Sequence, residues 1–233
     1  MAKSIYLAKY TSMGYFPNLY HSFKVFFLIN FLVPCCIYGQ EENRTFHLLF
    51  TAGVAPAQVH GDAYSGFHKL GLIGGVGVES EISETTRCNL SLLFVQKGAQ
   101  KNPNLTKGDV NAYYLNLNYL EVPCLLTYLH KKIAFEMGLA AAYLINYYEA
   151  DQNMIYTGVY PFQKFDYSVK LGLGKSFNEK WMIHFRSSNS FITTRPNRIK
   201  QALYYNNIIA RTFNKGYYNN ILELTLSYKI KGR

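Results

Sequence analysis

The chain has 233 residues, of which 24 are Lys or Arg and 14 are Asp or Glu, so its formal net charge is +10. Only 16% of the residues are charged, whereas 49% are hydrophobic and 16% are aromatic. This composition excludes a disordered basic tail, a collagen-like repeat and a coiled coil. The four cysteines are too few and too scattered for a disulfide-built miniprotein or a zinc module.

The first forty residues differ from the rest of the chain, because they contain lysines but no acidic residue. A short apolar stretch follows Lys24 and ends at Gly39 and Gln40. A membrane-spanning helix needs about 20 apolar residues, and this stretch is shorter. The pattern predicts a secretory signal peptide over residues 1–39, cleaved between Gly39 and Gln40. One domain over residues 40–233 remains, with 21 basic and 14 acidic residues and a charge of 21 − 14 = +7.

From Thr45 onward the apolar residues alternate with polar ones, which is the period of a β-strand. The last segment shows this best, since one face carries Leu222, Leu224, Leu226, Tyr228 and Ile230, and the other carries Glu223, Thr225, Ser227 and Lys229. The same reading predicts eight strands, at approximately 45–56, 67–82, 86–98, 112–129, 132–147, 162–177, 180–193 and 217–230.

The links between these strands alternate in length. Tight turns occupy 83–85, 130–131 and 178–179, whereas long links run over 57–66, 99–111, 148–161 and 194–216. Short periplasmic turns and longer external loops are typical of outer-membrane barrels. The sequence therefore predicts an all-β fold, an eight-stranded antiparallel up-and-down transmembrane β-barrel in a Gram-negative outer membrane, with both termini in the periplasm.

The two faces of the strands indicate which side meets lipid. One face is continuously apolar, and the other combines Gly, Ala and Ser with isolated charges. Small residues and opposite charges suit the narrow interior of eight strands, which favours a membrane barrel over a soluble lipocalin-like carrier of a ligand, the alternative. We expect the interior charges to form ion pairs that fill the lumen without conduction: Lys69, Glu79, Arg87, Glu136, Asp166, Lys170, His184, Arg186 and Glu223.

Three strings of residues resemble a known family. They are Gln96-Lys97-Gly98-Ala99, then Leu117-Asn118-Tyr119-Leu120-Glu121-Val122-Pro123, then Ala134-Phe135-Glu136-Met137-Gly138-Leu139. Over roughly 46–230 the chain resembles the PorT-like outer-membrane β-barrels of Bacteroidota. The resemblance implies an eight-stranded outer-membrane barrel, and some relatives are associated with protein export across that membrane. Within a strand, Pro123 predicts a bulge or a break in the pairing.

No catalytic motif stands out. The glycines after Gly71 lie within a strand and no helix follows, which excludes a dinucleotide-binding loop. Ser168, His184 and Asp166 are the residue types of a hydrolase triad, so an outer-membrane barrel hydrolase is a further alternative to a packing network. A metal held by His60, Asp62 and His68 is an alternative to solvated loop residues. We expect no enzymatic activity, no cofactor and no metal.

The last long link is basic and contains Arg195, Arg198, Lys200, Arg211 and Lys215, with no acid between Glu179 and Glu223. Outside an outer membrane such a surface suits lipopolysaccharide phosphates, acidic glycans or an acidic protein, although an ordinary solvated loop is the alternative. We expect a monomer in contact with outer-membrane lipid and lipopolysaccharide and not with nucleic acid. It would act through external loops, or as an accessory with a secretion or envelope protein partner. For its mature thiols, Cys88 and Cys124, free thiols are favoured over a disulfide, which the compartment permits.

Overall fold

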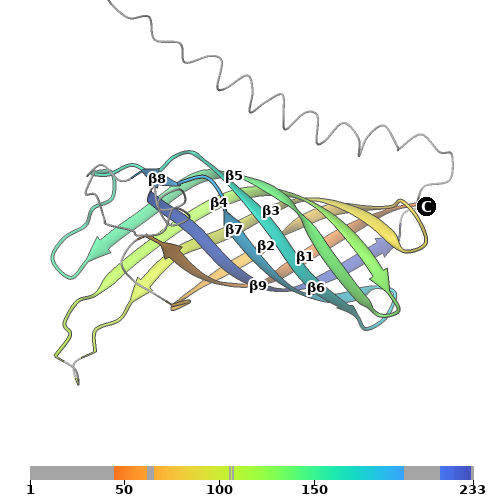
Figure 1. The fold of residues 1–233 in the computed structure, drawn as a ribbon, viewed down its shortest axis with the longest axis horizontal. Coiled ribbons are helices and arrows are strands. Elements are labelled where there is room, and N and C mark those ends of the chain that lie inside the picture. The colour runs from red at the N-terminus through yellow and green to blue at the C-terminus, as the bar shows by residue number, and fades with distance from the viewer. Residues whose placement is uncertain (1–44, 62–65, 105, 107, 197–215, 232–233) are drawn as a thin grey trace, which may run out of the picture. The chain divides into compact units, whose positions relative to one another are not determined.

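The structure is a computed structural model that describes residues 45–61, 66–104, 106, 108–196 and 216–231. Its strands form one antiparallel sheet (Figure 1). The long strands are β1 (Phe46–His60), β2 (Lys69–Glu81), β3 (Thr86–Lys101), β4 (Tyr113–His130), β5 (Ile133–Asp151), β6 (Phe165–Ser176), β7 (Trp181–Ser190) and β9 (Gly216–Lys231). The two residues of β8 (Arg195–Pro196) pair with the first residues of β9.

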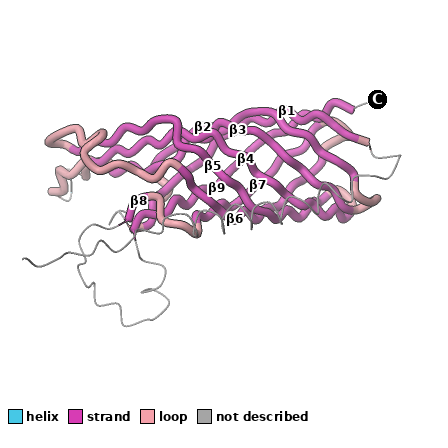
Figure 2. Tube along the Cα trace, turned by 90° about the horizontal axis from the view of Figure 1, so that it is seen from above, coloured by secondary structure: helices cyan, strands magenta, loops and turns pink. Residues whose placement is uncertain are grey.

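The sheet closes into a barrel, because each long strand pairs with the next and β9 pairs back onto β1. Figure 2 shows the closed tube with loops at its two ends. When paired residues are followed from strand to strand once around the barrel, the path starts at His47 and returns to β1 at Ala57. It passes through Glu79, Asn89, Leu125, Gly138, Lys170, Ser188 and Ile221. The stagger is therefore 57 − 47 = 10 residues, which in an eight-stranded barrel tilts the strands by about 40°. The predicted fold class is confirmed.

The predicted strands differ from the observed ones mainly at the end of the barrel that carries the long links, here the loop end. There β1, β3 and β5 run three or four residues further than predicted, to His60, Lys101 and Asp151. The opposite end of the barrel, where the tight turns lie, is called the tight-turn end below. The extensions of β1 and β3 were missed because their outward side chains, Gln58, His60 and Gln100, are polar, whereas the ladder hydrogen bonds that hold a strand do not depend on polarity.

The outward face is apolar from the tight-turn end up to a ring of amides. Its exposed side chains include Phe46, Leu48, Phe50, Leu72, Val78, Leu92, Val122, Met137, Leu171, Phe185 and Leu224. The ring, here the amide girdle, is formed by Gln58, Gln96, Asn118, Asn146, Asn189 and Asn220, which meet in register in two groups of three. Above it, β3, β4 and β5 continue. An apolar band that ends at a polar ring is the surface a bilayer requires.

The inward face changes character along the barrel. Toward the tight-turn end it is polar, but at the loop end it holds buried Leu115, Leu117, Tyr119 and Leu144, each at most 1% exposed. A second apolar cluster lies at mid-height and contains Ala55, Ala57, Ile73, Leu93, Val95 and Ile221. The expectation that the apolar excess faces lipid and not a core is thus wrong for part of the chain. Where the strands rise above the girdle, apolar residues again pack inside, as in a soluble protein.

Two residues of the family-like strings shape β3 and β4. Pro123 interrupts the ladder between these strands, which is paired at Leu90 with Cys124 and again only at Leu93 with Glu121. The predicted break is confirmed, since proline has no N–H to donate. Gly98 has a φ of 135°, and a Cβ at this position would lie 2.1 Å from the carbonyl oxygen of Leu115. Only glycine allows β3 and β4 to approach so closely.

Candidate functional site

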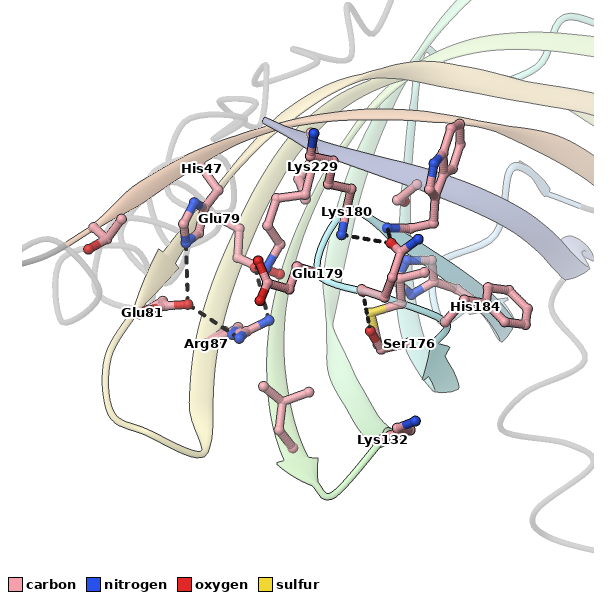
Figure 3. Close-up of a pocket in the computed structure, with 18 residues that line it drawn as sticks. His47, Glu79, Glu81, Arg87, Lys132, Ser176, Glu179, Lys180, His184 and Lys229 are labelled. Atoms are coloured by element: carbon pink, nitrogen blue, oxygen red, sulfur yellow. Dashed lines mark hydrogen bonds and ion pairs between the residues drawn. The ribbon is translucent and has the colours of Figure 1, made fainter. Parts of the chain in front are cut away.

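The mouth layer is a chain of ion pairs at the tight-turn end, made of His47, Glu79, Glu81, Arg87 and Lys229 (Figure 3). The Nζ atom of Lys229 lies 2.5 Å from Oε1 of Glu79, and Arg87 bridges Glu79 at 3.4 Å and Glu81 at 3.2 Å. Nε2 of His47 lies 3.2 Å from Oε1 of Glu81. Strands β9, β2, β3 and β1 are thereby linked across one wall of the lumen.

The middle layer lies further inside and consists of Glu136, His184 and Arg186. Nε of Arg186 donates to Oε2 of Glu136 at 2.6 Å, and Nη2 donates to Oε1 at 3.1 Å. Nδ1 of His184 lies 2.9 Å from the same Oε1. A two-pronged arginine contact is among the strongest charge-assisted hydrogen bonds, so this layer ties β5 to β7 across the lumen.

The central cluster occupies the middle of the lumen and contains Lys97, Glu121, Asp166, Lys170 and Glu223. Lys97 lies 2.8 Å from Glu121 and 3.0 Å from Asp166, while Lys170 lies 2.5 Å from both Glu121 and Glu223. All five side chains are at most 1% exposed. Buried charges persist only when paired, and here two ammonium groups bind three carboxylates from β4, β6 and β9.

Sequence reasoning missed Lys97 and Glu121 as lumen residues, although both stand in the strings that carry the family resemblance. The signal was present: Lys97 shares its face of β3 with buried Asn89 and Ser91, and Glu121 shares its face of β4 with Thr127. The ring of Tyr119 lies 5.0 Å below the ammonium of Lys97, as a cation–π pair. The strings therefore contain residues that lie at the centre of the lumen.

The loop end is closed by a latch of Arg195, Glu149, Tyr113, Phe162 and Tyr160. Both carboxylate oxygens of Glu149 accept hydrogen bonds from Arg195, at 2.9 and 2.5 Å, and the Tyr113 hydroxyl donates to Glu149 at 2.8 Å. The carbonyl oxygen of Tyr160 also accepts a hydrogen bond from Arg195. The guanidinium lies 3.6 Å from the centre of the Phe162 ring. Burial alone would lower the pKa of Arg195, but Glu149 outweighs it and raises that pKa.

Most of the predicted lumen charges face one another inside the barrel, but Lys69 does not join them. Lys69 is 3% exposed, and its ammonium lies 5.1 Å from the centre of the Tyr114 ring. Among the described residues no carboxylate lies within ion-pair distance of it. Lys69 stands at the loop end of β2, and its expected ion pair is not formed with any described residue.

The residues of the hypothetical triad are not brought together. Asp166 accepts hydrogen bonds from Lys97, Ser190 and Asn219, while Ser168 meets Ser188 at 3.1 Å. His184 stands opposite Gly174 in the register, six residues along β6 from Ser168, or about 20 Å. No group of three metal-binding side chains occurs in the described ranges, and Asp62 lies outside them.

The predicted basic surface is placed only in part. Arg195 is bound to Glu149, an acid of β5, so its charge is already paired within the barrel. Arg198, Lys200, Arg211 and Lys215 lie outside the described residues, as do Gly39 and Gln40 of the predicted cleavage site.

The cysteines Cys88 and Cys124 lie on neighbouring strands. Cys88 stands opposite Leu126 on β4, and Cys124 stands opposite Leu90 on β3, so the two cysteines are diagonal neighbours. Both are half-buried on the outward face.

A cavity of about 650 Å³ opens at the tight-turn end (Figure 3). The mouth layer and His184 form one side, and Leu49, Leu129 and Met182 also line it. The turns between β4 and β5 and between β6 and β7 contribute Lys132 and Lys180. It is a cavity with ionic and apolar walls.

In the part of the chain that the structure describes, no helix is long and apolar enough to cross a membrane.

A family model described as "Outer membrane protein beta-barrel domain" matches residues 38–194. No curated protein matches the sequence. Among solved structures, Neisserial surface protein A matches with a TM-score of 0.48 and 10% identity over 81% of this chain and 100% of that one. The attachment invasion locus protein Ail of Yersinia pestis, in complex with the heparin analogue sucrose octasulfate, gives 0.45 and 9% over 80% and 99%. CarO of Acinetobacter baumannii gives 0.40 and 9% over 77% and 96%.

Proposed function

The chain belongs to the outer membrane protein β-barrel domain family, and from this membership we propose that it is a non-conducting, non-enzymatic barrel that serves as an accessory in the cell envelope. The single observation that carries the proposal is the filled lumen. The mouth layer, the middle layer, the central cluster, the loop-end apolar cluster and the latch follow one another along the barrel. Eight strands leave an interior just wide enough for side chains.

Because the lumen is filled, the protein would act through the two ends of the barrel and not through its interior. At the loop end the start of the last external loop is held by the latch residue Arg195 and by its neighbour Thr194. The N–H of Thr194 donates to the carbonyl oxygen of Tyr217, and its carbonyl oxygen accepts the N–H of Gln163. The basic residues Arg198, Lys200, Arg211 and Lys215 follow Arg195 in the sequence. Contact of that loop with lipopolysaccharide phosphates or an acidic partner stays a proposal, supported by its excess of lysine and arginine.

We place the chain among the PorT-like barrels of Bacteroidota on the strings around Lys97 and Glu121, whose side chains pair in the central cluster. An accessory role in protein secretion follows from that placement. The signal peptide over residues 1–39 and the periplasmic termini complete the proposal, with support from the apolar stretch after Lys24 and from the alternation of tight turns and long links.

A soluble lipocalin-like carrier does not fit the structure, because the exposed outward face is apolar from Phe46 to the amide girdle and charges fill the lumen. A barrel hydrolase finds no support either, since Ser168, His184 and Asp166 are each engaged with other residues.

Labelling of whole cells with a membrane-impermeant maleimide tests the proposed placement. Asn153→Cys lies in the external loop after β5, and Lys131→Cys lies in the tight turn between β4 and β5. We expect the first variant to be labelled in intact cells and the second only after the outer membrane is permeabilised. The reverse pattern would contradict the placement. Affinity capture of envelope partners from the same cells then tests the accessory role, which fails if no envelope protein is enriched over a tag-only control.

A further inference from the structure

The outward face of β3, β4 and β5 at the loop end carries amides and tyrosines in register. Gln96, Asn118 and Asn146 stand side by side as one group of the amide girdle. In the next outward row toward the loop end, Asn116 stands beside Tyr148, and Tyr114 lies beyond it on β4. The rings of Tyr114 and Tyr148 lie 6.2 Å apart and are 39% and 43% exposed. We call these six residues the amide–tyrosine face.

The amide–tyrosine face is uncharged and has hydrogen-bonding capacity that the barrel does not use. Nδ2 of Asn118 donates to Oδ1 of Asn146 at 2.7 Å, and Oε1 of Gln96 accepts the N–H of Leu72 at 3.2 Å. The NH₂ groups of Gln96 and Asn116 have no acceptor among the described residues, and neither group is fully buried. Asn146 is an exposed residue whose oxygen alone is engaged. The face therefore offers open donors beside two exposed rings.

This combination of groups suits a saccharide. Amides and tyrosine hydroxyls both donate and accept, as sugar hydroxyls do, and a tyrosine ring offers an apolar surface to the C–H side of a sugar ring. A phosphate would need an open cation, but Lys69, whose ammonium lies 5.1 Å from the centre of the Tyr114 ring, is 3% exposed. A protein partner is usually held by apolar or arginine anchors, and the face has none.

The row directly below the amide–tyrosine face shows what kind of saccharide would lie there. Phe94, Leu120 and Tyr143 stand in register in that row and are 39%, 41% and 45% exposed. They form the top of the outward apolar band, which acyl chains cover. A ligand that matches both rows therefore joins a sugar headgroup to acyl chains, whereas a soluble glycan matches the upper row only.

We propose that the amide–tyrosine face binds the sugar rings of an outer-leaflet glycolipid of the lipopolysaccharide type, whose acyl chains lie against Phe94, Leu120 and Tyr143. This inference deepens the contact with lipopolysaccharide proposed above, because it assigns recognition of uncharged sugars to the barrel wall and not to the basic loop. It rests on the proposed insertion with the loop end outward, since such glycolipids occupy the outer leaflet.

The test is a titration of the purified, detergent-solubilised barrel with rough lipopolysaccharide, which is lipid A with core sugars, followed by NMR of the side-chain amides. We expect saturable shifts of the Asn116 and Asn146 signals and none of the Asn220 signal, which comes from the other group of the amide girdle. Phosphatidylethanolamine should shift none of the three signals. Equal shifts of Asn146 and Asn220 would overturn the proposal.

Two altered probes distinguish the sources of the ligand. Lipopolysaccharide stripped of its phosphates should keep its affinity within about twofold, because the face has no cation to pair with them. The core oligosaccharide released from lipid A should shift the same signals but bind about tenfold more weakly, because it lacks the acyl chains. A tenfold loss without phosphates would show that charge is recognised, and equal binding of the released oligosaccharide would indicate a soluble glycan; either result contradicts the proposal.

Matched double variants separate the face from the girdle in general. Asn146→Ala with Tyr148→Ala should weaken lipopolysaccharide binding about tenfold or more, because a hydrogen-bonding amide and a ring are lost. Asn220→Ala with Tyr218→Ala removes the same two residue types from β9, where Tyr218 stands opposite His60, and should change binding less than about twofold. Equal losses contradict the proposal, once heat-modifiable migration has verified that both variants are folded. The titration is independent of membrane orientation, so its failure is distinct from a failure of the labelling experiment.

Discussion

At the scale of single residues, Gly98 shows how one backbone position shapes the barrel. Its φ of 135° and the carbonyl oxygen of Leu115 leave no room for a side chain. Gly108 is the matched control, since its φ is also positive, at 69°, but an added Cβ would meet nothing within 4 Å. We expect Gly98→Ala to lower the free energy of unfolding by about 2 kcal/mol more than Gly108→Ala does. Urea unfolding followed by heat-modifiable gel migration measures this, and equal losses would contradict it.

Asp151 holds the tip of a hairpin at the loop end and gives it a pH dependence. The Tyr156 hydroxyl and the N–H groups of Met154 and Asn153 donate to its carboxylate, and they lower the pKa of Asp151 below its ordinary value of 3.8. The pKa is lower in the folded loop, so this stabilisation is present above the unfolded value and lost as pH falls through the folded one. We expect the Met154 amide signal to move only below pH 3.8. In Asp151→Asn the movement should vanish, and a transition above that pH would contradict this assignment.

At the scale of elements, the central cluster joins β6 to β9 through Lys170 and Glu223. Lys170→Met leaves the carboxylates of Glu121 and Glu223 buried with less compensation, and should cost about 3–5 kcal/mol of unfolding free energy. Adding Glu223→Gln should restore part of that loss, because one uncompensated charge is removed. Lys175→Met is the matched control on the exposed side of β6 and should change stability by less than about 0.5 kcal/mol. A loss in the double variant equal to the sum of the single losses would show that the pair is not coupled.

Periodicity predicted the strands well, because each transmembrane strand faces lipid on one side and the lumen on the other. It predicted the inward position of Glu136, Asp166 and Arg186 for the same reason. It did not reveal that Lys69 has no carboxylate within ion-pair distance among the described residues, because partners across the lumen depend on the stagger of ten residues, which alternation alone does not fix. The pairing of Arg195 with Glu149 joins residues 46 positions apart and was missed likewise.

The loop-end core shows a further limit of pattern reading. Leu115, Leu117 and Tyr119 occupy the same inward face of β4 as Glu121. The alternation along the strand is therefore continuous, although the inward side chains change from polar to apolar toward the loop end. Below the amide girdle the outward face is apolar, and toward the loop end apolar residues fill the interior. The amides themselves mark the change, since Asn118 faces outward from β4 and donates to Asn146 at 2.7 Å.

At the scale of the whole molecule, the barrel is one closed sheet that lies partly in the lipid bilayer and partly in water. Its lower part presents an apolar surface, to about 25 Å of hydrocarbon, and its upper part stands in water with an apolar core. Ion pairs fill the lumen where small residues leave space, and aromatic and aliphatic side chains fill it above. We infer that these layers close the path through the lumen and leave the two ends of the barrel as the surfaces through which the protein acts.

Planar-bilayer recording of the purified barrel tests that claim most directly. The account predicts no stable open conductance at any applied voltage, because each layer from the mouth to the latch blocks the lumen. Heat-modifiable migration of the same sample verifies that the barrel is folded. Reproducible single-channel steps from folded protein would contradict the account.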